Sequence, residues 1–141
     1  MSRRRSRMRQ QPEAALALYG TQLLEVDGWR AIKLETVSDH ERKRFNGEPG
    51  MPDYLYLRYS AKESGSKKWN QSRFDNTTTC QHLWIEWKAT RGKVSANQSE
   101  WHRNERVRGG VVWVALQDFP ATPEGFKTFY EASGLCRKRL I

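Results

Sequence analysis

The sequence predicts an α/β fold in which helices flank a mixed β-sheet. Apolar residues recur at helical spacing in three segments, which begin near residues 12, 95 and 122. Three strand-like runs follow the first helix, which favours an antiparallel meander. The last strand is reached through a helix with short links, and such a crossover is right-handed and pairs its strands in parallel. The 141 residues suit one domain with one core.

The first predicted element is a helix that starts at Pro12, since proline fits the first turn of a helix, and that ends before Gly28. Its apolar stripe consists of Leu16, Tyr19, Gly20, Leu23 and Leu24. Glu13 lies one turn before Leu16 and shares this stripe. An acid there is either exposed at the helix start, where it suits the helix dipole, or directed at the sheet. The pattern favours neither reading.

The strands follow in order. Residues 29–37 alternate and predict a strand, and 38–48 predict a polar, basic loop. A second strand covers 53–58, after a turn that contains Gly50 and Pro52. Residues 60–81 form a long polar stretch, which is either a functional loop such as a flap over nucleic acid or a hairpin extension of the flanking strands. Residues 83–89 predict the third strand.

The second half alternates helix and strand. Ser95 and Gln98 have the spacing of a capping box, which starts a helix that ends at about Arg108, before Gly109 and Gly110. The apolar run 111–116 is typical of a strand covered on both faces. The last helix starts at Thr122-Pro123 and is closed by Gly134.

The charge favours a polyanionic partner. The chain has 25 Lys and Arg against 16 Asp and Glu, a net charge of +9. Nucleic acid is the expected partner, ahead of an anionic membrane surface. Residues 1–11 carry five arginines and predict a flexible arm, and 137–141 predict a basic tail. We expect DNA contacts from these residues: Arg42, Lys43, Arg44, Lys67, Lys68, Trp69, Arg91, Lys93 and Arg103. Because no segment resembles a base-reading module, these contacts predict recognition of DNA shape.

Several classes of protein are disfavoured. No run approaches the roughly 20 apolar residues of a membrane span, and no apolar signal-peptide core is present, so a cytoplasmic protein is expected. Cys80 and Cys136 show no disulfide or zinc spacing and predict free thiols in a reducing compartment. The three histidines, His40, His82 and His102, are scattered and are predicted to be surface or structural residues.

Two acids and a lysine form the candidate site. Asp53 opens one strand and Glu86 lies in the next, with Lys88 two residues on and hence on the same face. If the strands pair with Asp53 near Glu86, two carboxylates and one ammonium converge. Carboxylate oxygens are the ligands that Mg²⁺ prefers.

A Glu-x-Lys pair on a strand usually marks a solvated face. Here the neighbours Trp84, Ile85 and Trp87 predict a strand that is buried on both faces. Burying the two charges without partners would cost several kcal/mol. A wet, metal-filled cleft removes this conflict. These tryptophans and Trp113 are predicted core residues.

Four motifs in this order resemble the VRR-NUC (virus-type replication-repair nuclease) family of the PD-(D/E)xK superfamily. They are Gly50-Met51-Pro52-Asp53, Trp84-Ile85-Glu86-Trp87-Lys88, Gln98 and Gly110-Val111-Val112-Trp113-Val114. The resemblance runs from about residue 13 to 115. It implies a restriction-endonuclease-like, three-layer core, with residues 12–136 as the nuclease domain and a basic insertion at about 60–81.

The resemblance also implies the site. In that family a helical glutamate, the Pro-Asp aspartate and the Glu-x-Lys pair surround Mg²⁺ or Mn²⁺, and a helical glutamine lies beside the lysine. The matching residues are Glu13, Asp53, Glu86, Lys88 and Gln98. Glu25 and Glu35 are alternatives to Glu13, which fits the early-helix position better. The backbone carbonyl of Trp87 is a further expected metal ligand.

The function implied is a metal-dependent, structure-selective DNA endonuclease. Family members include stand-alone phage proteins of similar length, which resemble dimeric resolvases of four-way (Holliday) junctions. We therefore expect a homodimer that cuts branched DNA, in the cytoplasm of a bacterial host. A flap-processing or site-specific nuclease is an alternative within the same class. A catalytically silent DNA-binding module on the same fold is an alternative of another class.

Overall fold

The computed structural model describes residues 12–34, 38–39, 44–45, 47–60 and 79–137. Its elements follow one another in this order: α1 (Glu13–Val26), β1 (Arg30–Lys33), β2 (Ser38–Asp39), β3 (Arg44–Phe45), β4 (Tyr54–Ser60), β5 (Thr79–Glu86), α2 (Ala96–Val107), β6 (Val112–Val114) and α3 (Pro123–Ala132).

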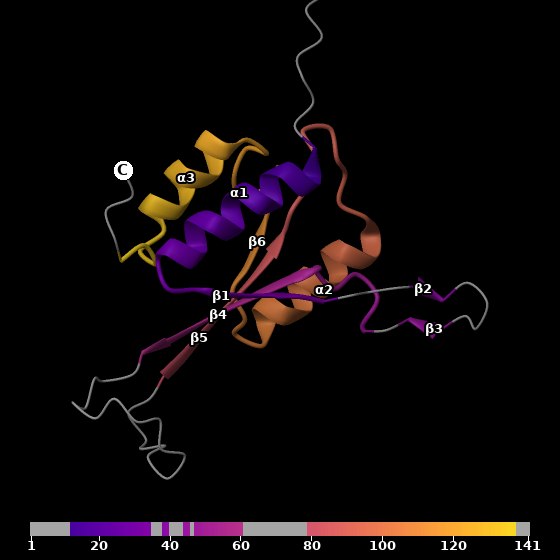
Figure 1. The fold of residues 1–141 in the computed structure, drawn as a ribbon. Coiled ribbons are helices and arrows are strands. Elements are labelled where there is room, and N and C mark those ends of the chain that lie inside the picture. Colours follow the sequence, from indigo (N-terminus) through magenta and orange to yellow (C-terminus); the bar gives the residue numbers. More distant parts are fainter. Residues whose placement is uncertain (1–11, 35–37, 40–43, 46, 61–78, 138–141) are drawn as a thin grey trace, which may run out of the picture.

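Four strands form one mixed sheet in the order β1-β4-β5-β6. The first three pair antiparallel, and β6 pairs parallel to β5 through the α2 crossover. The predicted α/β class with a mixed sheet is therefore confirmed, as are the meander and the parallel pair. Helices α1 and α3 lie together on one side of the sheet and α2 lies on the other (Figure 1).

The predicted strand bounds need correction. The strand predicted for 29–37 is shorter, because β1 ends at Lys33. The predicted loop 38–48 contains a two-stranded ribbon, in which Ser38 of β2 pairs with Phe45 of β3. Strands of only two residues carry no alternation that a sequence pattern can show. Strand β6 likewise covers only the middle of the apolar run 111–116.

The second hairpin is longer than predicted. Strand β4 runs to Ser60 and β5 starts at Thr79, so the hairpin-extension reading of 60–81 holds at both flanks. Residues 61–78 lie outside the described part of the chain. Strand β5 ends at Glu86, so Lys88 follows the strand and is not part of it.

The core has two parts, one on each face of the sheet. Under α1 and α3 lie Leu16, Leu24, Ile85, Trp87, Trp113, Phe126 and Tyr130. Under α2 lie Trp101, Val112 and Val114, with Met51 and Trp84 packed against them. The core placement predicted for Trp87 and Trp113 is confirmed, whereas Trp84 is only half-buried.

Helix α1 is fixed along the sheet by one glycine. A Cβ at Gly20 would lie 2.1 Å from the indole ring of Trp87, so no larger residue permits this approach. The Trp87 indole donates to the hydroxyl of Tyr56 at 3.0 Å, and this hydroxyl also contacts Thr21 of α1 at 2.7 Å. Burial raises the pKa of Tyr56, so the phenol stays protonated. The close approach of Gly20 to Trp87 therefore fixes the position of α1 relative to the end of β5.

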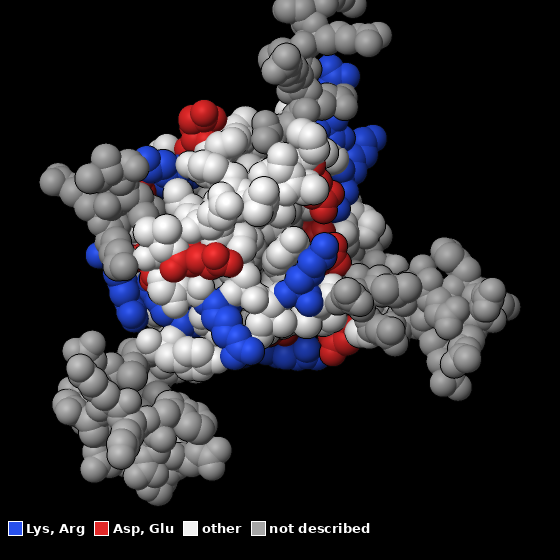
Figure 2. All heavy atoms as spheres, viewed as in Figure 1, with Lys and Arg blue, Asp and Glu red and all other residues white. Residues whose placement is uncertain are grey.

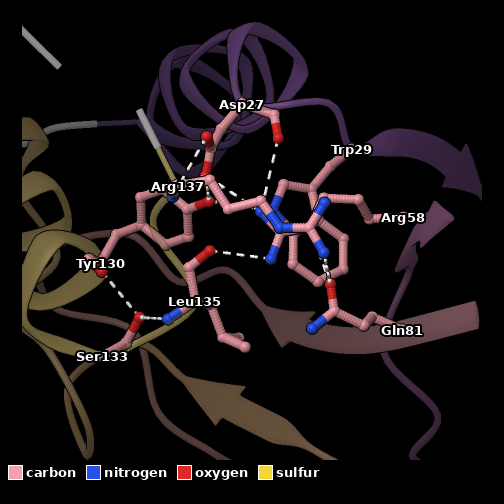
Figure 3. A network of polar contacts seen from close by, with 8 residues as sticks. All are labelled: Asp27, Trp29, Arg58, Gln81, Tyr130, Ser133, Leu135 and Arg137. Carbon is pink, nitrogen blue, oxygen red and sulfur yellow. Dashed lines mark hydrogen bonds and ion pairs between the residues drawn. The ribbon is translucent and has the colours of Figure 1, made fainter. Parts of the chain in front are cut away.

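A buried polar network joins the end of α1, the sheet and the last residues described (Figure 3). Asp27 is 3% exposed, and its Oδ2 lies 3.1 Å from Nη1 of Arg58. The same carboxylate accepts from the Tyr130 hydroxyl and from the backbone N–H of Arg137, the latter at 2.9 Å. Arg58 also donates to the Leu135 carbonyl at 2.8 Å. The chain after α3 is thereby held against the sheet.

Two side chains form hydrogen bonds with the outward-facing backbone groups of the edge strand β6. The Val114 N–H, which points away from β5, donates to Oδ2 of Asp118 at 2.7 Å. The outward carbonyl of Val112 accepts from Arg106 at 2.8 Å. Arg106 and Asp118 also form an ion pair at 3.2 Å. The two side chains thus take the place that another strand would fill.

Candidate functional site

The register of the sheet brings Asp53 and Glu86 face to face. Tyr54 of β4 lies opposite Ile85 of β5, and one further step along this antiparallel pair sets Asp53 opposite Glu86. Opposite residues share a face, with Cβ atoms about 4.5–5.5 Å apart. The Leu34 N–H donates to the Asp53 carbonyl at 2.7 Å, so β1 also holds this end of β4.

Gln98 joins Glu86 to Lys88. Its Nε2 donates to Oε1 of Glu86 at 2.8 Å, and its Oε1 accepts from Nζ of Lys88 at 2.9 Å. The Lys88 ammonium lies 3.5 Å from Oε1 of Glu86, and the two side chains are 11% and 8% exposed. The carboxylate and the ammonium therefore point the same way, as the spacing predicted, although Lys88 lies beyond the strand.

The capping box of α2 orients Gln98. The Ser95 N–H donates to Oε1 of Gln98 at 2.9 Å, and the Gln98 N–H donates to Oγ of Ser95 at 3.1 Å. This confirms the predicted helix start. One amide oxygen of Gln98 thus accepts both from the helix end and from Lys88. The fixed side-chain direction at the third residue of α2 is what directs its amide to Glu86.

The turn before Asp53 rests on the same helix. Gly50 has φ +83°, and a Cβ there would lie 2.2 Å from the backbone oxygen of Asn97. Two residues earlier, Oε2 of Glu48 accepts from the Trp101 indole at 2.6 Å. Helix α2 therefore supports both halves of the site, the Pro-Asp turn and the Glu86 side chain.

Gly50→Ala is expected to lower the free energy of unfolding by about 2–4 kcal/mol, because the new Cβ meets helix backbone and the residue needs a left-handed conformation. Gly109→Ala is the matched control. Gly109 has φ +97° and nothing within 4 Å of a built Cβ, so only the backbone penalty of about 1–2 kcal/mol applies. Urea unfolding of both variants checks this. Equal losses would contradict a tight contact between the turn and α2.

Glu13 lies in the first turn of α1 and is exposed. The residue as a whole is exposed, but partial desolvation of its carboxyl raises the pKa of that group; Lys88 lowers the pKa, and Glu86 and Asp53 raise it further. All three charges of the site therefore reach Glu13. The start of α1 lies beside the loop that follows β5 (Figure 1). Of the other candidates, Glu25 is at the far end of the helix, and Glu35 lies outside the described residues.

Glu13→Gln is expected to raise the free energy of unfolding of the metal-free protein at about pH 7, by an amount that fades toward pH 4. The pKa of Glu13 is raised above 4.5 in the folded state, so its contribution is fullest below 4.5 and is lost as the pH rises through the folded value. Solvent exposure keeps the gain small. Urea unfolding in EDTA measures it, with Glu100→Gln on the outer face of α2 as control. Parallel pH profiles for the two variants would contradict the coupling.

The donor set suits a hard cation. In the described part of the chain, no group of three or more His, Cys, Asp or Glu side chains is placed to hold a metal ion. Asp53 and Glu86 supply two carboxylates, and Oε2 of Glu86 is buried without a hydrogen-bond partner. Mg²⁺ commonly takes one or two protein carboxylates and retains several waters. The pair therefore fits Mg²⁺ or Mn²⁺, whereas a structural zinc site needs four protein ligands.

His102 lies beside the site, and the sequence analysis did not single it out. It was predicted to be a surface or structural residue; it is 1% exposed, which excludes the surface reading, and its Nε2 lies 3.5 Å from Oε2 of Glu86. The available signal was its spacing. His102 comes four residues after Gln98 on α2, so the two side chains share a helix face.

The predicted DNA contacts are described only in part. Arg91 and Lys93 are exposed in the turn after Lys88, and Arg103 is exposed on α2. Arg44 lies in β3, while the other predicted contacts, Arg42, Lys43, Lys67, Lys68 and Trp69, lie outside the described residues. On the face shown in Figure 2, basic and acidic side chains are interspersed.

Within the described ranges, no helix is long and apolar enough to cross a membrane. Neither Cys80 nor Cys136 forms a disulfide. Comparison of the chain with protein family models, with curated proteins and with solved structures found no match.

Proposed function

We propose that the protein is a divalent-metal-dependent deoxyribonuclease of the PD-(D/E)xK type that cuts branched DNA. The observation that carries this proposal is the register of β4 and β5, which places Asp53 one step beyond the Tyr54–Ile85 pair and hence opposite Glu86. Lys88 is linked to Glu86 through Gln98. The meander, the crossover to a parallel strand and the helix that presents Glu13 support a restriction-endonuclease-like core.

The carboxylates of Asp53 and Glu86 would hold Mg²⁺ or Mn²⁺, with the backbone carbonyl of Trp87 as a further ligand and Glu13 beside them. When bound, such an ion lowers the pKa of a coordinated water and offsets charge on the scissile phosphate. Glu86 is fixed for this role by its bond to Gln98. The negative charge that raises the pKa of Glu13 is the charge that a cation would neutralise.

The Lys88 ammonium supplies the positive group of the site. It is bonded to Gln98 at 2.9 Å and is only 11% exposed, so its position is set before substrate arrives. An ammonium held there can orient the attacking water and stabilise charge that develops on the phosphate oxygens. Because its partners come from both β5 and α2, the group stays in place without a bound nucleotide.

The charge of the chain supports a DNA substrate. The net charge is +9, and Arg91 and Lys93 are exposed immediately after Lys88. Contacts from such residues go mainly to phosphates, so we propose that DNA shape and not base sequence is recognised. Affinity should then fall steeply with added salt. The resemblance to stand-alone resolvases favours a four-way junction as substrate and a homodimer as the active form, since a junction presents two symmetric strands to cut.

The test uses end-labelled four-way junctions, flaps, splayed arms and linear duplexes, each with Mg²⁺, with Mn²⁺ and with EDTA. Cleavage of the junction that requires a divalent cation is the expected result. Preferred cleavage of flaps would retain the nuclease and replace the resolvase. Salt-sensitive binding without cleavage in either metal would contradict the nuclease and support the silent DNA-binding module.

A further inference from the structure

We propose that His102 is a positioning residue that, together with Gln98, fixes the carboxylate of Glu86 in the orientation that a divalent cation requires. The inference rests on the proposed function, because it concerns the same site. It assigns a partner to Oε2 of Glu86, because the contacts with Gln98 and Lys88 involve only Oε1.

Two residues on one face of α2 meet the two oxygens of one carboxylate. Gln98 donates to Oε1 at 2.8 Å, and Nε2 of His102 lies 3.5 Å from Oε2. Positions four apart on a helix are neighbours on its surface. Helix α2 therefore reaches Glu86 at two adjacent points, and the capping box that fixes Gln98 also fixes the start of the helix that presents His102.

The burial of His102 requires such a partner. Oε2 of Glu86 and both ring nitrogens of His102 are buried and have no hydrogen bond. Leaving buried polar atoms unpaired is costly, and these two side chains face each other. With a hydrogen on Nε2, the ring can donate to Oε2 and give these two atoms a partner. The two atoms lie 3.5 Å apart without a hydrogen bond in this structure, and such contacts are often long or poorly aligned before substrate binds.

The ring is also held in place by packing. His102 is 1% exposed, and its ring meets that of the neighbouring Trp101 edge to face, with centroids 6.3 Å apart. Trp101 in turn is fixed by its bond to Glu48 at 2.6 Å. A donor that cannot turn away restricts the rotation of the Glu86 carboxylate and leaves its other lone pairs for a cation. Removing an outer partner of this kind typically weakens metal binding by about 10–100-fold.

The test compares Mn²⁺ affinity, measured by calorimetry on the metal-free full chain, in four proteins. These are the parent, His102→Gln, His102→Asn and His102→Leu. Glutamine places an amide donor near the position of Nε2, whereas asparagine is too short and leucine has no donor. We expect His102→Gln to bind within a few-fold of the parent, and the other two variants to bind about 10–100-fold more weakly.

Urea unfolding in EDTA separates this role from a structural one. A merely structural histidine would change stability in all three variants and leave the Mn²⁺ affinity of the folded protein unchanged. If His102→Leu does not fold, the comparison of the glutamine and asparagine variants still decides. Equal affinity in those two would overturn the inference.

Glu86→Gln distinguishes the two possible failures. If the parent binds Mn²⁺ and Glu86→Gln loses it, while His102→Asn and His102→Leu retain it, the inference alone fails. If the parent binds no divalent cation, the proposed function fails and the inference falls with it.

Discussion

Lys88→Ala is expected to reduce DNA cleavage by about 10²–10³-fold or more and to leave DNA binding largely intact, because it removes a preorganised charge at the reacting phosphate. The fold should persist, since the Gln98 oxygen that loses the Lys88 contact keeps the bond from the Ser95 N–H. Asp53→Ala should have an effect at least as large, through loss of a metal ligand. Single-turnover cleavage of a labelled junction and a binding assay in Ca²⁺ check both expectations.

The matched control is Lys127→Ala. Lys127 lies on α3, outside the site, and its contact with Glu131 is a long ion pair of 3.9 Å. This variant loses the same charge and should cut at the parental rate. A Lys88→Ala protein that cuts as well as the parent would show that the role assigned to the lysine is wrong. Equal losses in both lysine variants would point to general DNA affinity and not to the site.

Asp27→Ala is expected to lower the free energy of unfolding by about 3–5 kcal/mol, because it removes the carboxylate that pairs with the buried Arg58 guanidinium. The carboxylate is shared by Arg58, Tyr130 and the Arg137 backbone, so all three lose a bond at once. Burial raises the pKa of Tyr130, and the Asp27 contact raises it further, so this phenol remains a donor to the carboxylate. Urea unfolding measures the loss.

Because a loss of this size approaches the total stability of many domains, Asp27→Asn serves as a second variant. It keeps the shape and removes the charge, and should cost less than alanine. Glu131→Ala, which breaks the 3.9 Å pair on the outside of α3, is the control and should change stability by no more than about 0.5 kcal/mol. A loss below about 1 kcal/mol in Asp27→Ala would mean that Arg58 finds other partners.

Local signals predicted the three helices, the four strands of the main sheet and half of the candidate site. Helical spacing and the caps at Ser95 and Thr122 gave helices within a residue or two of their bounds. The two-residue period of a strand placed Glu86 and Lys88 on one side. The capping box of Ser95 and Gln98 also predicted the start of α2, and hence the place of Gln98 in its first turn. Each of these inferences depends on residues that are close in the sequence.

What the sequence left undetermined depends on distant contacts. Asp27 and Arg58 are 31 residues apart, and Asp27 and Arg137 are 110 apart. Nothing local in the sequence marks Asp27 or Arg58 as buried. A single histidine such as His102 looks the same in sequence whether it lies on the surface or beside a carboxylate. The β2–β3 ribbon arises from backbone pairing of two-residue strands, which are too short to leave a periodic pattern in the sequence.

The side chains that occupy the rim of β6 restrict how two copies could assemble on a junction. With Arg106 and Asp118 bonded to the outward groups of that strand, a neighbouring subunit cannot continue the sheet there by adding a strand of its own. A dimer that joined two sheets would have to meet at β1, whose terminal residues Arg30 and Lys33 are exposed and positively charged. Like charges opposed across that seam would repel, so, among the elements that the structure describes, the helical surfaces are left for the twofold assembly that we propose.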